Sequence, residues 1–454
     1  MSRNIKKTLI LILLACLGIS QTFAQAVVFP QQNQPGAAKL TKSGDSYVLS
    51  NALLSATFTM SNGDLTFAGS EQLCLAAGTD LFKVTLGNGT EVKSSDMTLA
   101  SVEMQTLTGA SSAVKGSHKF NGKQLVANYT YGNLQIVWRA VLRDGSHYLR
   151  TDMDIVATAD QAMTNIIPMM YTLNNTSVAV VGNTRGAVLA GDKIFAGLET
   201  PMGKNTVTGT SIQGLWSRAT TLSAGEKWNV SSVVGLVADG QQRRSFLAYS
   251  ERERAVPWRP FPLYNSWYEL NINRKDNSSP SDNMKTSQAT DVLAQWKAKL
   301  FDAQNVGIKS FVWDDGWDNY QTWECHSNFD FTTPSATAEA MGAGTGVWLS
   351  PVGGYGTSGD KRRSYWESRG GMELSNDAYY EVFKAAASKF VTQYNGNFFK
   401  FDGISAQTVA TGPDTDATGE EDAEGIISME RDIRTLKEDI FLNTTVGTWA
   451  SPFW

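Results

Sequence analysis

The sequence predicts a multidomain chain that joins a β-rich first half to an α/β second half, and three observations favour this fold class. Short alternating segments separated by Asn-Gly and Asp-Gly type turns fill about residues 27 to 245, a pattern typical of a β-sandwich. After about residue 252, strand-like segments alternate with amphipathic segments of helix length, which indicates a parallel sheet or an α/β barrel. Ten of the 13 Trp residues lie after the same point, so the composition changes where the pattern changes.

Length and charge narrow the possible function classes. A chain of 454 residues is expected to form two or three domains. With 42% hydrophobic and 18% charged residues, the composition is that of a globular protein. The net charge of −5 leaves no basic footprint, so nucleic acid is not an expected partner. The sequence indicates no oligomeric state.

Residues 1–24 are predicted to be a secretion signal. Arg3 and two lysines precede an apolar run at residues 8–19, and Thr22-Phe23-Ala24 fits a small-x-small cleavage site. The run is too short to span a bilayer comfortably, so we expect export to the periplasm or beyond, without membrane insertion after cleavage. The segment ending at Cys16 also resembles a lipid-attachment box, but Leu14 fits it poorly, which makes a lipoprotein the less favoured alternative.

No cofactor and no metal site are predicted. After cleavage only Cys74 and Cys325 remain, and because they lie in different predicted domains we expect two free thiols. The three His residues form no cluster with cysteines in the sequence, so a zinc site is not expected.

Residues 25–250 are predicted to form the β-sandwich domain. The clearest hairpin joins residues 125–131 to 134–142 through Gly132-Asn133, a pair that supplies the positive φ of a tight turn. We predict no helix of clear periodicity in this half. A run of charged residues is expected to be a solvated face, namely Arg143, Asp144, Arg150, Asp152 and Asp154.

Residues 251–454 are predicted to alternate strands with helices. Strands are expected at residues 262–268, 308–313, 346–349, 398–402 and 440–445. Helices are expected at residues 287–303, 375–394 and 426–439, with a poorly defined one within 321–342. The acidic segment at residues 412–425 is expected to be a solvated loop, because its spacing fits no EF-hand.

Two strand ends carry candidate chemistry. Lys400 and Asp402 share one strand face, and a cation beside Asp402 would favour the ionised form that attacks a sugar anomeric carbon. The alternative is a buried ion pair that holds the strand end. Asp314 and Asp315 end the second strand, where adjacent buried carboxylates need donors such as sugar hydroxyls. The alternative there is a turn at Asp315-Gly316 with Asp314 as its cap.

Three motifs in order make residues 255 to 454 resemble the melibiase-type α-galactosidases, glycoside hydrolase family thirty-six and its relatives. They are Tyr264-Asn265-Ser266-Trp267, Trp313-Asp314-Asp315-Gly316-Trp317 and Lys400-Phe401-Asp402. The resemblance implies an N-terminal β-supersandwich, then an incomplete (β/α)8 TIM barrel with about five strands present at residues 251–454. It implies an exported retaining α-glycosidase that releases α-linked galactose or N-acetylgalactosamine from an oligosaccharide or glycan substrate through a covalent glycosyl-aspartate.

The resemblance also implies a role for each site residue. Asp402 corresponds to the nucleophile, and Lys400 to a residue that contacts the sugar and keeps Asp402 ionised. Asp314 and Asp315 correspond to acceptors for hydroxyls of galactose-type sugars. The expected pocket walls are three aromatic residues, Trp267, Trp313 and Trp348.

Two departures from the family pattern lead to further expectations. Trp348-Leu349-Ser350-Pro351 lacks the acidic residue that bacterial members often carry on strand three, which leaves the identity of the sugar open. The family's general acid/base follows strand six, whereas this sequence shows five strands, so we expect a C-terminally truncated chain that is inactive by itself. The alternatives are a non-catalytic carbohydrate-binding protein and a transglycosylase of the raffinose-synthase kind.

Overall fold

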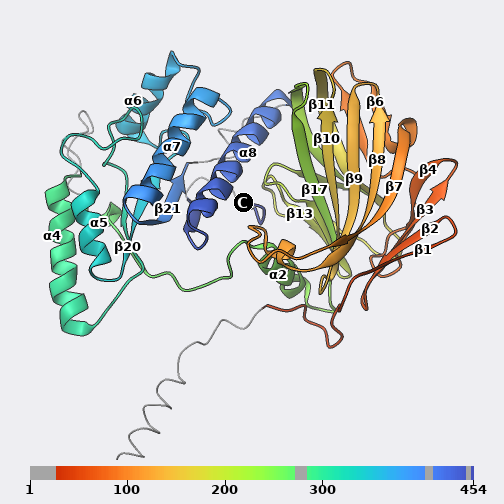
Figure 1. The fold of residues 1–454 in the computed structure, drawn as a ribbon, viewed down its shortest axis with the longest axis horizontal. Helices are drawn as coiled ribbons and strands as arrows, with labels where there is room; N and C mark the ends of the chain where they lie inside the picture. The colour runs from red at the N-terminus through yellow and green to blue at the C-terminus, as the bar shows by residue number, and fades with distance from the viewer. Residues whose placement is uncertain (1–26, 271–283, 404–412, 446–450) are drawn as a thin grey trace, which may run out of the picture.

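The computed structural model describes residues 27–270, 284–403, 413–445 and 451–454. A β-rich part and an α/β part lie side by side, with helix α8 between them (Figure 1). The predicted signal and the alternative attachment site at Cys16 lie outside the described residues. Within those residues, no helix has the length and apolar character that a membrane span requires.

The β-rich part consists of three antiparallel sheets. A four-stranded sheet has the order β1-β2-β3-β4. Its strands span Lys39–Ser43, Ser46–Ser50, Ser55–Ser61 and Asp64–Gly69. A five-stranded sheet has the order β15-β16-β11-β5-β6, with bounds Lys204–Thr208, Ser211–Leu222, Gln161–Thr172, Lys83–Leu86 and Glu91–Lys93. An eight-stranded sheet has the order β12-β13-β14-β17-β10-β9-β8-β7. Its bounds are Ala179–Val181, Val188–Ala190, Ile194–Leu198, Lys227–Leu236, Tyr148–Ala157, Leu134–Arg143, Gly122–Tyr131 and Thr98–Leu107.

These sheets share one apolar core, and Phe58, Trp138 and Trp216 are among its members. The predicted hairpin is confirmed as β8 and β9, which pair Tyr131 with Leu134. Gly132 takes the positive φ of 54° that the turn requires. Alternating apolar and polar residues, together with turn signals, therefore predicted the β-sheet character of this part.

The charged run in this part is only partly solvated. Arg139 bonds Asp152 and Asp154 on a half-buried surface, as a strand face would allow. Arg150, in contrast, is 5% exposed and forms ion pairs with Glu199 and Glu253. The prediction of a solvated face is thus wrong for Arg150, because its carboxylate partners come from distant segments, one of them the end of helix α2 (Gln242–Glu253).

The described residues of the α/β part form one parallel sheet of five strands, whose spatial order follows the chain. The strands are β18 (Leu263–Asn265), β19 (Ser310–Trp313), β20 (Gly344–Leu349), β21 (Gly396–Asp402) and β22 (Phe441–Thr445). A doubly wound sheet reverses its order at a switch point, and these five strands do not. The predicted strands are confirmed, but the first ends at Asn265 and the short helix α3 (Trp267–Leu270) follows.

The connecting helices differ more from the predictions. The structure has α4 (Thr286–Trp296), continued as a π-helix over Lys297–Asp302, then α5 (Thr332–Glu339), α6 (Gly356–Glu367), α7 (Asp377–Gln393) and α8 (Pro413–Leu436). Helix α6 was not predicted, since its sequence GTSGDKRRSYWE shows no apolar period.

The acidic segment is a correction to the predicted solvated loop. From Pro413 onward it belongs to α8, which packs against β16 and lies beside the β-rich part in Figure 1. Glu420 is 2% exposed and accepts a hydrogen bond of 2.8 Å from the Thr200 hydroxyl. Glu424 pairs with Arg218 at 2.8 Å. The acidic residues of this segment therefore help to join the two parts of the chain.

Strand alternation gives the parallel sheet two different faces. Phe311, Phe399 and Phe401 belong to the apolar core, and Phe399 lies against Phe390 of α7 with ring centroids 5.6 Å apart. Residues at the alternate positions of β21 include Lys400 and Asp402. The helix-covered face thus holds the apolar core, and the opposite face presents polar side chains at the carboxyl ends of the strands.

Candidate functional site

Asp402 lies at the carboxyl end of β21 and is 6% exposed. Its Oδ2 accepts a hydrogen bond of 2.9 Å from the indole Nε1 of Trp348, and its Oδ1 lies 3.4 Å from the hydroxyl of Tyr355. Burial raises the pKa of Asp402. The Trp348 donor and the charge of Lys400 oppose this shift in pKa, and the charge of Asp314 adds to it. The Asp402 carboxyl group is therefore buried, and it accepts hydrogen bonds from Trp348 and Tyr355.

Lys400 binds Asp314, which corrects the expected pairing. Its Nζ lies 2.8 Å from Asp314 Oδ2, so the charge of Lys400 lowers the pKa of Asp402 without forming the expected direct pair. The same Oδ2 accepts a hydrogen bond of 2.9 Å from Asn265 Nδ2. Asp314 Oδ1 accepts a hydrogen bond of 2.9 Å from the backbone N–H of Asp315. The alternative of a buried Lys400–Asp402 ion pair is therefore wrong, because the ion pair of Lys400 joins β21 to Asp314 at the end of β19.

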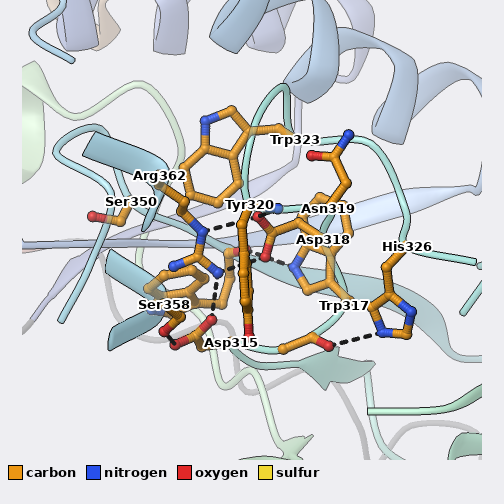
Figure 2. Close-up of polar contacts among 12 residues, drawn as sticks. Asp315, Trp317, Asp318, Asn319, Tyr320, Trp323, His326, Ser350, Ser358 and Arg362 are labelled. Atoms are coloured by element: carbon orange, nitrogen blue, oxygen red, sulfur yellow. Dashed lines mark hydrogen bonds and ion pairs between the residues drawn. The ribbon is translucent and has the colours of Figure 1, made fainter. Parts of the chain in front are cut away.

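Asp315 is held by a residue that the sequence did not indicate. Arg362 of α6 donates from Nη2 to Asp315 Oδ1 at 2.6 Å, and Ser358 lies 3.4 Å from Asp315 Oδ2. Arg362 also bonds the fully buried Asp318, at 2.9 Å from Nε and 2.5 Å from Nη2. Figure 2 shows the guanidinium between these two carboxylates. Asp315 is thus part of a buried ion cluster as well as a neighbour of Asp314.

Aromatic rings enclose the Arg362 guanidinium. Its Cζ lies 4.8 Å from the ring centroid of Tyr320 and 5.0 Å from those of Trp323 and Trp348, a geometry that favours a cation. Tyr320 and Trp323 have φ of 61° and 59°, which is strained for bulky residues. Arg362 therefore fixes the loop after β19 against the same Trp348 that binds Asp402.

The three aromatic residues predicted to line the pocket lie at different distances from Asp402. Trp348 contacts Asp402 directly. Trp267 is 37% exposed, and Lys400 Nζ lies 5.9 Å from its ring centroid, so Trp267 lies beside the site, on α3 instead of the predicted strand. Trp313 is fully buried and contacts Tyr264 and Phe329. Because it shares the helix-covered face with Phe311, the structure does not bring Trp313 to Asp402.

Three residues of the site were missed by the sequence reasoning. Arg362 and Ser358 lie on a helix without apolar periodicity, and no local signal marks them. Tyr355 follows Gly353-Gly354 in the short segment after the third strand, and these two glycines near a strand end were the one available signal.

No group of three or more His, Cys, Asp or Glu side chains among the described residues has the arrangement of a metal site. Cys74 and Cys325 are both free thiols. His326 contacts the Gly316 carbonyl at 3.1 Å, which leaves it a structural role in the loop after β19. The chemistry that this site offers is that of carboxylates, one ammonium group and aromatic donors.

Solved α-galactosidases share this fold. The enzyme from Lactobacillus brevis has 12% identity and a TM-score of 0.58, over 89% of this chain and 69% of that one. AgaB from Geobacillus stearothermophilus, a GH36 α-galactosidase, has 12% identity and a TM-score of 0.57, over 89% and 72% of the two chains. The galactosidase domain of the α-galactosidase–sucrose kinase AgaSK has 12% identity and a TM-score of 0.58, over 89% of this chain and 72% of that one.

No protein-family model matches the sequence, and no curated protein matches it either. At 12% identity, the likeness to the solved structures shows the fold alone. It shows a β-rich part followed by an α/β part, as in the GH36 enzymes.

Proposed function

We propose that this chain is an exported retaining α-glycosidase of the α-galactosidase type, with Asp402 as its nucleophile. Residues 25–250 would form the sandwich domain, and residues 251–454 part of a (β/α)8 catalytic barrel. The observation that supports this best is the position of Asp402. It is a buried carboxylate at the carboxyl end of a parallel strand, where barrel enzymes carry their catalytic groups, and neutral donors hold it beside the Lys400–Asp314 pair.

The proposed first step transfers the glycosyl group to Asp402. A carboxyl oxygen forms a bond to the anomeric carbon while the bond to the leaving-group oxygen breaks, and that oxygen takes the electron pair. A general acid protonates the leaving oxygen, and water later releases the sugar from the ester. We assign this acid to none of the described residues; the motif resemblance places it after a sixth strand.

Lys400 and Asp314 are proposed to bind the sugar. The ammonium group can donate to a ring hydroxyl, and Asp314 can accept from one, since both lie on the Asp402 face. Charge-assisted hydrogen bonds of this kind are stronger than neutral ones. The substrate class that we propose is an oligosaccharide or glycan ending in α-linked galactose or N-acetylgalactosamine.

The test is covalent trapping with 5-fluoro-α-galactosyl fluoride. Fluoride leaves with little help from an acid, so the experiment probes the nucleophile alone. Mass spectrometry of the treated chain should find one added fluorogalactosyl group, on Asp402. Asp402→Ala should abolish the label, and the exposed Asp360→Ala should keep it.

Other outcomes contradict the proposal in defined ways. A label on another carboxylate refutes the assignment of Asp402. Galactose binding that persists without any label supports the non-catalytic binding protein. If the label forms, product analysis with an acceptor sugar separates a hydrolase from a transglycosylase.

A further inference from the structure

Tyr355 connects the buried nucleophile of the proposed site to solvent. It follows β20 by a short segment and immediately precedes α6. Its side chain is large and aromatic, yet the residue is 54% exposed. Its hydroxyl nevertheless reaches to 3.4 Å from Asp402 Oδ1. One end of this residue thus contacts the carboxylate while its ring faces outward.

The backbone before Tyr355 is fixed in place. Gly353 and Gly354 have φ of 85° and 80°, a region that suits glycine. The carbonyl of Gly353 accepts a hydrogen bond of 2.8 Å from Arg362 Nη1. The carbonyl of Gly354 accepts one of 2.7 Å from Arg363 Nη1. A Cβ on Gly354 would lie 2.7 Å from the Trp348 ring. Two arginines of α6 and the Trp348 ring therefore hold this segment in one position.

Gly403 lies between Asp402 and the segment that carries Ser350 and Tyr355. It follows Asp402 and has φ of 90°. A Cβ at this position would meet Ser350 Oγ at 3.2 Å and the Tyr355 oxygen at 3.5 Å. The positive φ and the close approach of Ser350 therefore favour glycine at this position, whereas the Tyr355 oxygen lies at an ordinary van der Waals distance.

The two oxygens of Asp402 have different surroundings. Oδ2 is held by the buried Trp348 at 2.9 Å, whereas Oδ1 has the longer contact to the half-exposed Tyr355. An oxygen with a weaker partner on the open side has the freer lone pair. Oδ1 is therefore the less tightly held of the two oxygens.

We propose that Tyr355 positions Asp402 Oδ1 for attack and that its exposed ring binds the leaving-group sugar. This inference rests on the proposed glycosidase function. Aromatic faces stack on the C–H faces of sugar rings. In the transfer step, Oδ1 bonds to the anomeric carbon, the leaving group departs with its electron pair, and the phenol keeps its proton. Burial and the charge of Asp402 raise the pKa of Tyr355, so the phenol stays a donor.

The two roles are separated by Tyr355→Phe and Tyr355→Ala, with Tyr131→Ala at an exposed sandwich turn as the control. The first measurement is the rate of labelling by 5-fluoro-α-galactosyl fluoride against pH, since this probe has no leaving-group sugar. Tyr355→Phe should slow labelling up to about 10-fold, the scale of one hydrogen bond to a charged group. It should also move the acid limb to higher pH, because the lost donor lowered the pKa of Asp402.

The second measurement is calorimetric binding of galactose and of an α-galactosyl disaccharide. Tyr355→Ala should weaken disaccharide binding about 10-fold, the scale of losing one aromatic contact. Its galactose affinity should change less than the disaccharide affinity. Tyr355→Phe should keep the wild-type ratio of the two affinities, because it keeps the ring.

The outcomes distinguish this inference from the proposed function. Wild-type labelling rates and pH profile in Tyr355→Phe would overturn the positioning role. A wild-type affinity ratio in Tyr355→Ala would overturn the leaving-group role. If the unaltered chain is not labelled at Asp402, the proposed function fails, and this inference fails with it. Thermal unfolding of each variant confirms that the fold is kept.

Discussion

Replacing Arg362 with Met should strongly destabilise the α/β part of the chain. Arg362 has no solvent exposure, and it bonds Asp315 at 2.6 Å, Asp318 at 2.5 and 2.9 Å, and the Gly353 carbonyl at 2.8 Å. Met keeps much of the length of the side chain but removes the charge and every donor. Two buried carboxylates then lose their shared cation.

The magnitude follows from the two unpartnered charges. Removing one partner of a buried ion pair costs about 3–5 kcal/mol, and the strained backbone at Tyr320 and Trp323 loses the cation between their rings. Arg362→Lys should fall between Met and wild type, since Lys keeps the charge without the planar fork.

The assay is urea unfolding at pH 8, followed by Trp fluorescence and far-UV circular dichroism. The sandwich transition should stay where it is, which provides an internal reference. Arg431→Met, an exposed change on α8, should alter stability by less than about 0.5 kcal/mol. A loss below about 1 kcal/mol for Arg362→Met would show that the cluster with Asp315 and Asp318 is not the support described above.

Three further predictions concern Glu420, Asp314 and Asp402. Burial and the charge of Glu424 raise the pKa of Glu420 from 4.5 to about 7, so Glu420 stabilises the fold fully below pH 4.5. About 3 kcal/mol of that stability is lost as the pH rises to 7. Urea unfolding of Glu420→Gln at both pH values should show no such loss. If the wild type and Glu420→Gln depend on pH in the same way, Glu420 is not the group responsible. Asp314→Asn should weaken galactose binding about 10-fold by calorimetry with little change in circular dichroism, and unchanged affinity would remove it from the sugar site. With α-galactosyl fluoride, azide should restore turnover by Asp402→Ala and give β-galactosyl azide by NMR, whereas fast turnover without azide would exclude the nucleophile role.

Local patterns predicted the parts of the fold that local physics determines. The apolar run at residues 398–402 is too short for a helix, and the structure has β21 there. Alternation along this strand placed Lys400 and Asp402 on one face, and both lie at the site. The helical period at residues 375–394 likewise corresponds to α7, which begins after an Asn376 cap.

Long-range partners explain most of what the sequence did not reveal. Helix α6 has a polar sequence, and its buried residue Arg362 is satisfied by Asp315 and Asp318 from the loop after another strand. Glu420 looked like part of a solvated loop because its partner, Thr200, is 220 residues away. Buried charges are rare without partners, so a pattern method assigns such residues to the surface unless the partners are known.

The pairing of Lys400 depends on the register between strands, which no single strand encodes. Lys400 of β21 pairs with Trp348 of β20. On the other edge of β20, Val347 pairs with Trp313 of β19. Asp314, the next residue after Trp313, therefore lies opposite Trp348 on the β19 side. Asp402 lies two residues farther along β21, about 6.6 Å away. The ammonium of Lys400 therefore meets Asp314 across β20, and the Trp348 indole turns toward Asp402. The proposed nucleophile is thus held by uncharged donors that orient it without neutralising it, and the nearby cation is bound to another carboxylate.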